Sequence, residues 1–119
     1  LFLAAASGFL SVTLGAFGAH SLKIFLDEYG KSIYEKAVLY QMFHTMALFA
    51  VGSLQLYFRN TSFSIAGACF LTGIVLFSGS LYVLALTGIK WIGAVTPIGG
   101  ISFLLGWFFL GLKIIKAHP

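Results

Sequence analysis

Charged side chains are absent from four long stretches of the chain. Three of these have 22 residues each and the longest has 30, at positions 1–22, 37–58, 91–112 and 60–89 respectively. A bilayer core of about 30 Å takes roughly 20 apolar residues to cross as an α-helix, and a helix satisfies its own backbone hydrogen bonds in lipid. The pattern therefore predicts an all-α membrane protein with four transmembrane helices, forming a single domain over residues 1–119. The expected spans are about 1–19, 37–58, 63–87 and 97–115.

An amphipathic pattern separates the first two expected spans. Its apolar residues recur at helical spacing, while its charged residues fall on the opposite side. The apolar set is Leu22, Phe25, Leu26, Tyr29 and Ile33, and the charged set is Lys23, Asp27, Glu28 and Lys31. This arrangement predicts a short interfacial amphipathic helix over about residues 21–36, with its apolar side shielded by the membrane surface.

Small residues form a stripe along one side of the first expected span. Spacings of four and three place them on one helix face. They are Ala4, Gly8, Ser11, Gly15 and Gly18, and the fourth span carries a shorter version in Gly99, Ser102 and Gly106. Close van der Waals contact is a main source of helix association in lipid. Both stripes are therefore predicted to be close helix-packing faces.

Polar side chains share one face of the second expected span. At about 100° per residue, they fall within roughly 100° of one another: Gln41, His44, Thr45, Gly52 and Gln55. Amides and a histidine facing lipid would leave unpaired polar groups, at several kcal/mol each, so this face is expected to point into the bundle. Its role is either a ligand, proton-relay or substrate site, or hydrogen bonding that fixes helix packing. We favour packing, because no carboxylate lies within an expected span.

Hydroxyl groups occur within the third expected span and at the start of the fourth. Ser78, Ser80 and Tyr82 lie close together, and Thr96 precedes Pro97 in a pattern typical of a helix start. A serine in a membrane helix can donate its hydrogen to a carbonyl of its own helix. These hydroxyls are therefore assigned to buried polar packing, not to chemistry, and they are the nearest expected hydrogen-bond partners of Gln41 and His44.

Two histidines lie on the same expected membrane side. His20 ends the first span, and His44 lies about 10 Å into the second at 1.5 Å per residue. Two histidines on neighbouring helices can serve as axial ligands of a haem. A histidine at a helix end more often caps backbone carbonyls, so the expectation is a protein without a cofactor or a metal site.

The composition excludes several other classes. With 60% hydrophobic residues, 8% charged residues and a mean hydropathy of +1.01, a soluble core would lack the polar surface to cover it. The seven Lys and Arg residues are scattered singly, unlike a nucleic-acid surface. Cys69 is the only cysteine, so no disulfide or metal-binding Cys pair is expected. Nucleotide-binding and hydrolase motifs do not occur.

Basic residues do not decide the orientation. Four lie on the side of the first and third loops, and three lie on the side of the termini and the second loop. The chain starts at Leu1 instead of Met, so further residues, which could carry charge, are expected to precede it. Both termini are expected on the cytoplasmic side.

Four segments, taken in order, resemble a known family. They are GAFGAH at 15–20, YEKAVLYQMFH at 34–44, FSGSLYVLALTG at 77–88 and WIGAVTPIGG at 91–100. Together they resemble the bacterial family catalogued as domain of unknown function 423, whose animal relative is transmembrane protein 256. The resemblance implies a small multi-span inner-membrane protein without an assigned biochemical activity. It also implies that characteristic polar residues fall on His20, Gln41, His44, Ser78, Ser80, Tyr82 and Thr96.

The sequence as a whole predicts an accessory or interaction subunit of a larger membrane complex that is not an enzyme. Its expected partners are the lipid bilayer and either other membrane subunits or a second copy, with neither nucleic acid nor nucleotide. The expected location is the bacterial cytoplasmic (inner) membrane. A small transporter or channel lined by Gln41, His44 and Gln55 is the main alternative. A haem or quinone protein using His20 and His44 is the third.

Overall fold

The computed structural model describes residues 1–118, which form helices joined by short turns. Four helices are long and apolar enough to cross a membrane, so the predicted all-α membrane fold is confirmed. The third is continuous through a π-helical turn, and the fourth starts with a short 3₁₀ turn. The elements are α1 (Phe2–His20), α2 (Glu28–Tyr57), α3 (Ser64–Gly73), the π turn η1 (Ile74–Ser78), α4 (Gly79–Thr87), the 3₁₀ turn η2 (Lys90–Ala94) and α5 (Thr96–Lys116).

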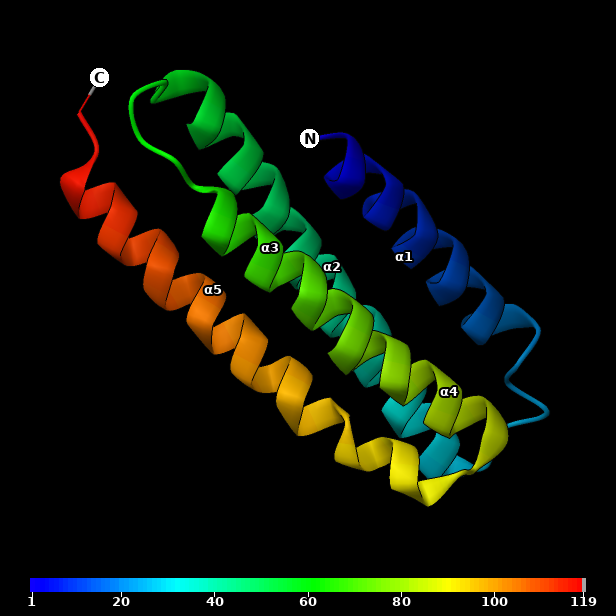
Figure 1. Cartoon of the computed structure of the whole chain (residues 1–119). Coiled ribbons are helices and arrows are strands. Elements are labelled where there is room, and N and C mark those ends of the chain that lie inside the picture. The colour runs from blue at the N-terminus through cyan, green and yellow to red at the C-terminus, as the bar shows by residue number, and fades with distance from the viewer. Residues whose placement is uncertain (119) are drawn as a thin grey trace.

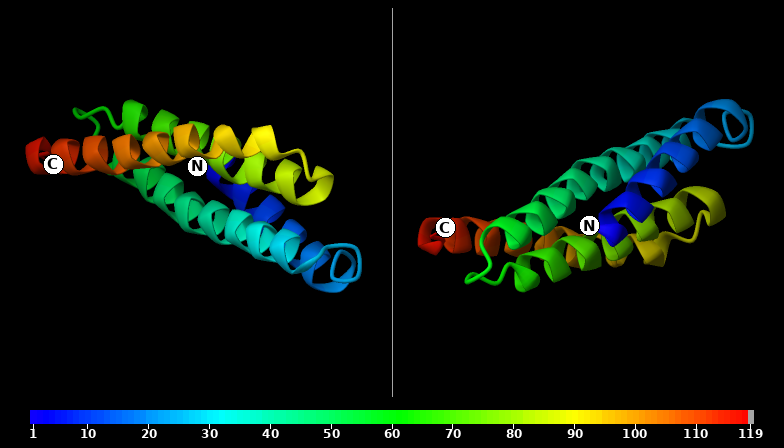
Figure 2. Two further views of the ribbon diagram at one scale, coloured as in Figure 1. Left: turned by 90° about the horizontal axis from the view of Figure 1, so that it is seen from below. Right: turned by 90° about the horizontal axis from the view of Figure 1, so that it is seen from above.

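The helices run along the long axis of an elongated molecule (Figures 1 and 2). Its extents are 51 × 26 × 16 Å. α1 packs against α2, α2 packs against α3, η1 and α4, and α5 packs against α3 and η1. α1 starts and α5 ends at the end of the molecule where α2 turns into α3 (Figure 1). The molecule is therefore thin, and much of its helix surface is left for lipid or for other proteins.

Local signals explain where several helices begin and end. The Asp27 carboxylate caps α2 by accepting a hydrogen bond of 2.7 Å from the Gly30 backbone N–H. α4 stops before Gly88, which adopts the left-handed conformation with φ of 71°. α5 starts at Thr96, followed by Pro97 in its first turn, where proline does not remove a helical hydrogen bond.

The predicted separate interfacial helix is not present between α1 and α2. Residues 21–27 form a turn instead, and the second half of the predicted segment is the start of α2. Gly30 does not interrupt the helix, because it lies in the first turn, where Asp27 binds its N–H. Of the predicted apolar side, Leu22 and Ile33 are buried within the protein, whereas Phe25 and Tyr29 are exposed on it.

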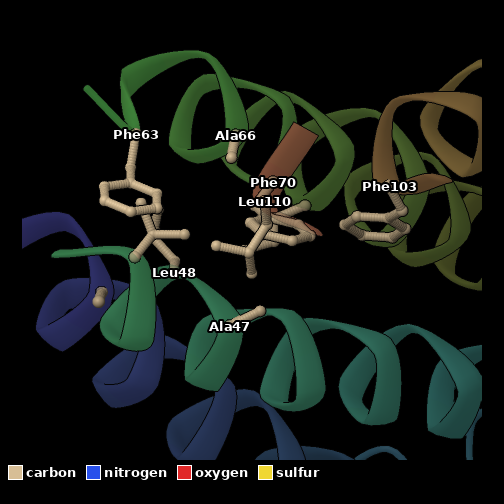
Figure 3. Close-up of a cluster of buried hydrophobic side chains, with 10 residues drawn as sticks. Ala47, Leu48, Phe63, Ala66, Phe70, Phe103 and Leu110 are labelled. Carbon is tan, nitrogen blue, oxygen red and sulfur yellow. The ribbon is translucent and has the colours of Figure 1, made fainter. Parts of the chain in front are cut away.

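The main hydrophobic core lies between α2, α3 and α5 (Figure 3). Phe70 is completely buried, and Phe63 in the turn before α3 is nearly so. A second cluster joins α2 and α4 through Ile33, Ala37, Leu81 and Leu84. Since lipid is as apolar as these side chains, van der Waals packing holds the helices together here.

Candidate functional site

Gln41 is the centre of a buried hydrogen-bond network that joins three helices. Its Oε1 accepts a hydrogen bond of 2.7 Å from the Tyr82 hydroxyl in α4. Its Nε2 donates to the Ser7 carbonyl of α1, at 3.2 Å. The hydroxyls of Ser7 and Thr45 share a further bond of 2.6 Å. Gln41 therefore points to neighbouring helices, with Tyr82 as a predicted partner and Ser7 as one that the sequence analysis missed.

His44 faces α5 and uses both of its ring nitrogens. Nδ1 lies 2.9 Å from the Tyr40 carbonyl, and Nε2 lies 3.2 Å from the indole Nε1 of Trp107. A carbonyl can only accept and an indole can only donate, so these partners assign a neutral ring with its hydrogen on Nδ1. The ring also stacks on Phe103, with centroids 3.5 Å apart and planes 7° from parallel. The histidine is thus built into the α2–α5 contact.

Three hydroxyls hold the third span against its neighbours. Ser78 Oγ donates to the Ala37 carbonyl of α2 at 2.8 Å, so its bond crosses between helices instead of returning to its own. Ser80 Oγ donates to the Phe77 carbonyl and also shares a bond of 2.6 Å with the Thr96 hydroxyl. Thr96 thus connects α5 to α4 and makes no side-chain cap of its own helix.

Gln55 lies apart from the rest of the polar stripe. Its Oε1 accepts from the Phe63 N–H at 2.8 Å, and its Nε2 donates to the Thr61 carbonyl at 3.1 Å. The amide therefore closes the turn between α2 and α3. Gly52, one turn earlier, faces Leu1. The residues that share one face of α2 in the sequence thus divide among separate contacts and do not line one common path.

His20 and His44 do not come together. His20 is exposed at the end of α1, two residues beyond Gly18, which faces Tyr34 of α2. Tyr34 precedes His44 by ten positions, about 15 Å along a helix axis. A haem bridging this pair does not fit that spacing. Within residues 1–118, no cluster of three His, Cys, Asp or Glu side chains could hold a metal ion.

The small-residue stripe of α1 faces α2. A Cβ at Gly18 would lie 2.8 Å from Tyr34 Cδ1, and one at Gly15 would lie 3.3 Å from Val38 Cγ1. The Tyr34 hydroxyl donates a hydrogen bond to the Leu14 carbonyl of α1. The other members of the stripe are buried or half-buried: Ala4, Gly8 and Ser11.

The shorter stripe of α5 faces the third span. A Cβ at Gly99 would lie 2.7 Å from Phe77 Cα, and one at Gly106 would lie 2.7 Å from Phe70 Cδ1. Between them, Ser102 Oγ donates at 2.7 Å to a backbone carbonyl of α3. At Gly99 the obstacle is the backbone of the π turn, so the absence of a side chain lets two main chains approach.

The buried polar atoms are paired throughout the described part of the chain. No buried side-chain nitrogen or oxygen in residues 1–118 lacks a hydrogen-bond partner. Four apolar helices with a closed set of interior hydrogen bonds define a small multi-pass membrane protein. The chain belongs to the family described as Protein of unknown function (DUF423), whose sequence model matches residues 14–100. The resemblance drawn from the sequence is therefore confirmed.

Relatives in several bacteria match nearly the whole chain. UPF0382 membrane protein SAB0533 of Staphylococcus aureus (strain bovine RF122 / ET3-1) is 42% identical, covering 98% of this chain and 94% of that protein. UPF0382 membrane protein YwdK of Bacillus subtilis is 38% identical, covering 98% and 95%. A UPF0382 membrane protein of Haemophilus influenzae is 44% identical, covering 98% and 94%. No solved structure matches. With four apolar helices, the chain is a multi-pass bacterial membrane protein.

Proposed function

We propose that the protein is an accessory subunit that binds other subunits of a membrane complex and is not an enzyme. The proposal rests on one observation: the polar side chains inside the protein are already hydrogen-bonded to other groups of the protein. Gln41 is bonded at both ends of its amide and His44 at both nitrogens. A substrate site or proton path needs polar groups directed at a ligand or at water. Here they are bonded to other groups of the protein, in three of these four bonds to a group on another helix.

The thin shape supports a contact role. With a shortest extent of 16 Å, the molecule has little interior for a substrate path. Large apolar side chains on α1 and α5 are exposed on the protein, among them Phe9, Val12, Phe17, Leu104 and Phe108. In a membrane such surfaces are covered by lipid or by helices of another protein. The proposed partner is therefore itself membrane-spanning.

We further propose the cytoplasmic membrane as the location, with both termini in the cytoplasm. Arg59, Lys113 and Lys116 lie at that end of the molecule, and four lysines lie at the opposite end. The preference of basic residues for the cytoplasmic side therefore does not decide the orientation, and a fusion at the C-terminus measures it directly. A C-terminal alkaline phosphatase fusion should be inactive and a fluorescent protein fusion bright, and the opposite result would reverse the orientation.

The test of the accessory role is recovery of a complex from native membranes. A tagged chain extracted in mild detergent should elute with larger membrane proteins identifiable by mass spectrometry. Gly99→Leu should abolish this recovery, because its side chain would meet the Phe77 backbone. His44→Gln should reduce recovery less, since a polar side chain remains.

The same samples test the transport and haem alternatives. Flux into liposomes and visible spectra are measured for the wild-type chain and for His44→Gln. If the histidine variant assembled normally but lost a transport activity or a haem spectrum, the accessory role would be wrong. The polar network around Gln41 and His44 would then be the site that matters.

A further inference from the structure

A groove with a volume of about 260 Å³ lies between the C-terminal half of α1 and the N-terminal half of α2. Small residues form its α1 wall, namely Gly15, Gly18 and Ala19, and the Tyr34 ring of α2 packs against Gly18. The α2 wall extends from Lys31 to Met42. The groove is a feature of the surface and takes no part in the polar network around Gln41.

The length and position of the groove match one leaflet of a bilayer. From Lys31 to Met42 the wall covers about 16 Å at 1.5 Å per residue, and half of a hydrocarbon core is about 15 Å. Lys31 and Glu35 lie at one end, before the charge-free stretch that begins at residue 37. The other end is lined by Val38, Leu39 and Met42. The groove therefore starts at the membrane surface and continues into the hydrocarbon layer.

The charges at the surface end are of both signs. Lys31 Nζ lies 3.4 Å from Glu28 Oε1, but an exposed pair of this kind is weak, and an ammonium group has three hydrogens to donate. Glu35 makes no ion pair within the described part of the chain. Lys31 and Glu35 are four residues apart and so lie on the same side of the helix. Together they complement a headgroup that carries a phosphate and an ammonium group.

We propose that this groove binds one phosphatidylethanolamine molecule of the adjacent leaflet. One acyl chain lies along the apolar wall, the phosphate binds Lys31, and the ammonium group binds Glu35. A phosphatidylglycerol of the same chain length has the phosphate but no ammonium group, so it satisfies only Lys31. The inference goes beyond the accessory role and does not depend on it.

The experiment is native mass spectrometry of the purified full chain with equal amounts of synthetic phosphatidylethanolamine and phosphatidylglycerol that have the same acyl chains. The wild-type chain should retain the ethanolamine lipid in preference. Glu35→Gln should lower the ratio of the two bound lipids by roughly two- to fivefold, as for the loss of one exposed ion pair. Lys31→Gln should lower retention of both. Lys36→Gln is the matched control, because Lys36 is exposed and does not line the groove.

A second variant tests the groove without changing a charge. Ala19→Phe fills it from an exposed position of α1 and should remove both bound lipids while the thermal unfolding of the protein stays unchanged. Equal retention of the two lipids by the wild-type chain would overturn the proposal. So would a ratio that falls as much in Lys36→Gln as in Glu35→Gln, or full lipid retention by Ala19→Phe.

Discussion

Gly99 lies where α5 meets the backbone of the π turn. A Cβ there would be 2.7 Å from Phe77 Cα, and a backbone cannot move aside as a flexible side chain can. We expect Gly99→Ala to destabilise the protein by about 1–3 kcal/mol, as is common for overpacking. Thermal unfolding in bicelles, followed by circular dichroism, measures this.

Gly79 provides the matched control for that substitution. A Cβ at Gly79 has open space around it, and alanine in a helix is favoured over glycine by roughly 0.5–1 kcal/mol. Gly79→Ala should therefore leave the stability unchanged or slightly raised. If Gly99→Ala and Gly79→Ala lowered the stability equally, the close contact between α5 and Phe77 would not be the cause of the loss.

The hydrogen bond between Trp107 and His44 should appear as a coupling between the two residues. The bond is 3.2 Å long, and bonds between membrane helices average about 0.6 kcal/mol, with a maximum near 1.7. We expect a double-mutant cycle with His44→Phe and Trp107→Phe to give a coupling energy in this range. Unfolding of the four proteins in detergent mixtures measures it, and strictly additive losses would contradict the bond.

The sequence predicted which polar residues turn inward better than it predicted their partners. The pattern favoured third-span hydroxyls as partners of Gln41, and Tyr82 is one. It missed Ser7, although Ser7 lies three residues after Ala4 and so near the face of the small stripe. Trp107 was missed because its indole N–H belongs to a mostly apolar side chain. Such pairings depend on how helices rotate against each other, which a single-helix pattern does not contain.

At the scale of elements, the turn between α1 and α2 can be tested by labelling. Phe25 is 76% exposed on the protein, so only the membrane surface can shield it, as the amphipathic pattern predicts. In a Cys69→Ala background, Phe25→Cys should react slowly with a water-soluble reagent in vesicles and quickly in detergent. Ile33→Cys should react slowly in both, since Ile33 is buried.

Lys23→Cys is the reference for this comparison, because Lys23 is exposed and polar. It should react quickly in vesicles and in detergent. If Phe25→Cys reacted as fast as Lys23→Cys in vesicles, the membrane surface would not shield the turn, and the prediction would be wrong.

The sequence was enough to predict that the four membrane-spanning helices exist, but not where each helix starts or where its regular α-helical form is interrupted. Charge-free stretches set the four spans because lipid excludes charge over a fixed thickness. The same apolar spacing suits both a separate interfacial helix and the start of α2, and the Asp27 cap together with the place of Gly30 decides between them. The π turn at Ile74–Ser78 has no periodic signal. It lies where Gly99 and the Ala37 carbonyl contact the third span.

At the scale of the whole molecule, α1 is an outer helix attached mainly to α2. Its contacts include the bonds of Ser7 to Gln41 and Thr45 and the fit of Gly18 against Tyr34. We expect co-expressed fragments 1–26 and 27–119 to associate in the membrane and to co-purify through a tag on the larger one. Membrane helices that are each stable on their own can associate after insertion, so the two fragments are expected to restore the native contact between α1 and α2.

Substitution at Gly18 tests whether that association uses the observed face. Gly18→Leu should abolish co-purification, because its side chain would overlap the Tyr34 ring. Val12→Leu should not, because Val12 is exposed on α1. If co-purification were lost in both variants, or in neither, α1 would pack on the rest of the protein through a different face.

The amide of Gln55 holds the turn between α2 and α3 by both of its ends. The two helices it joins are neighbours in sequence and also pack against each other, so their pairing closes only a short loop and carries a small entropic cost. During synthesis, this hairpin is complete before α5 has left the ribosome. We expect the α1–α2 pair and this hairpin, each closed by a short turn, to form first, with α5 joining a preformed surface. The order of assembly would then follow the order of translation.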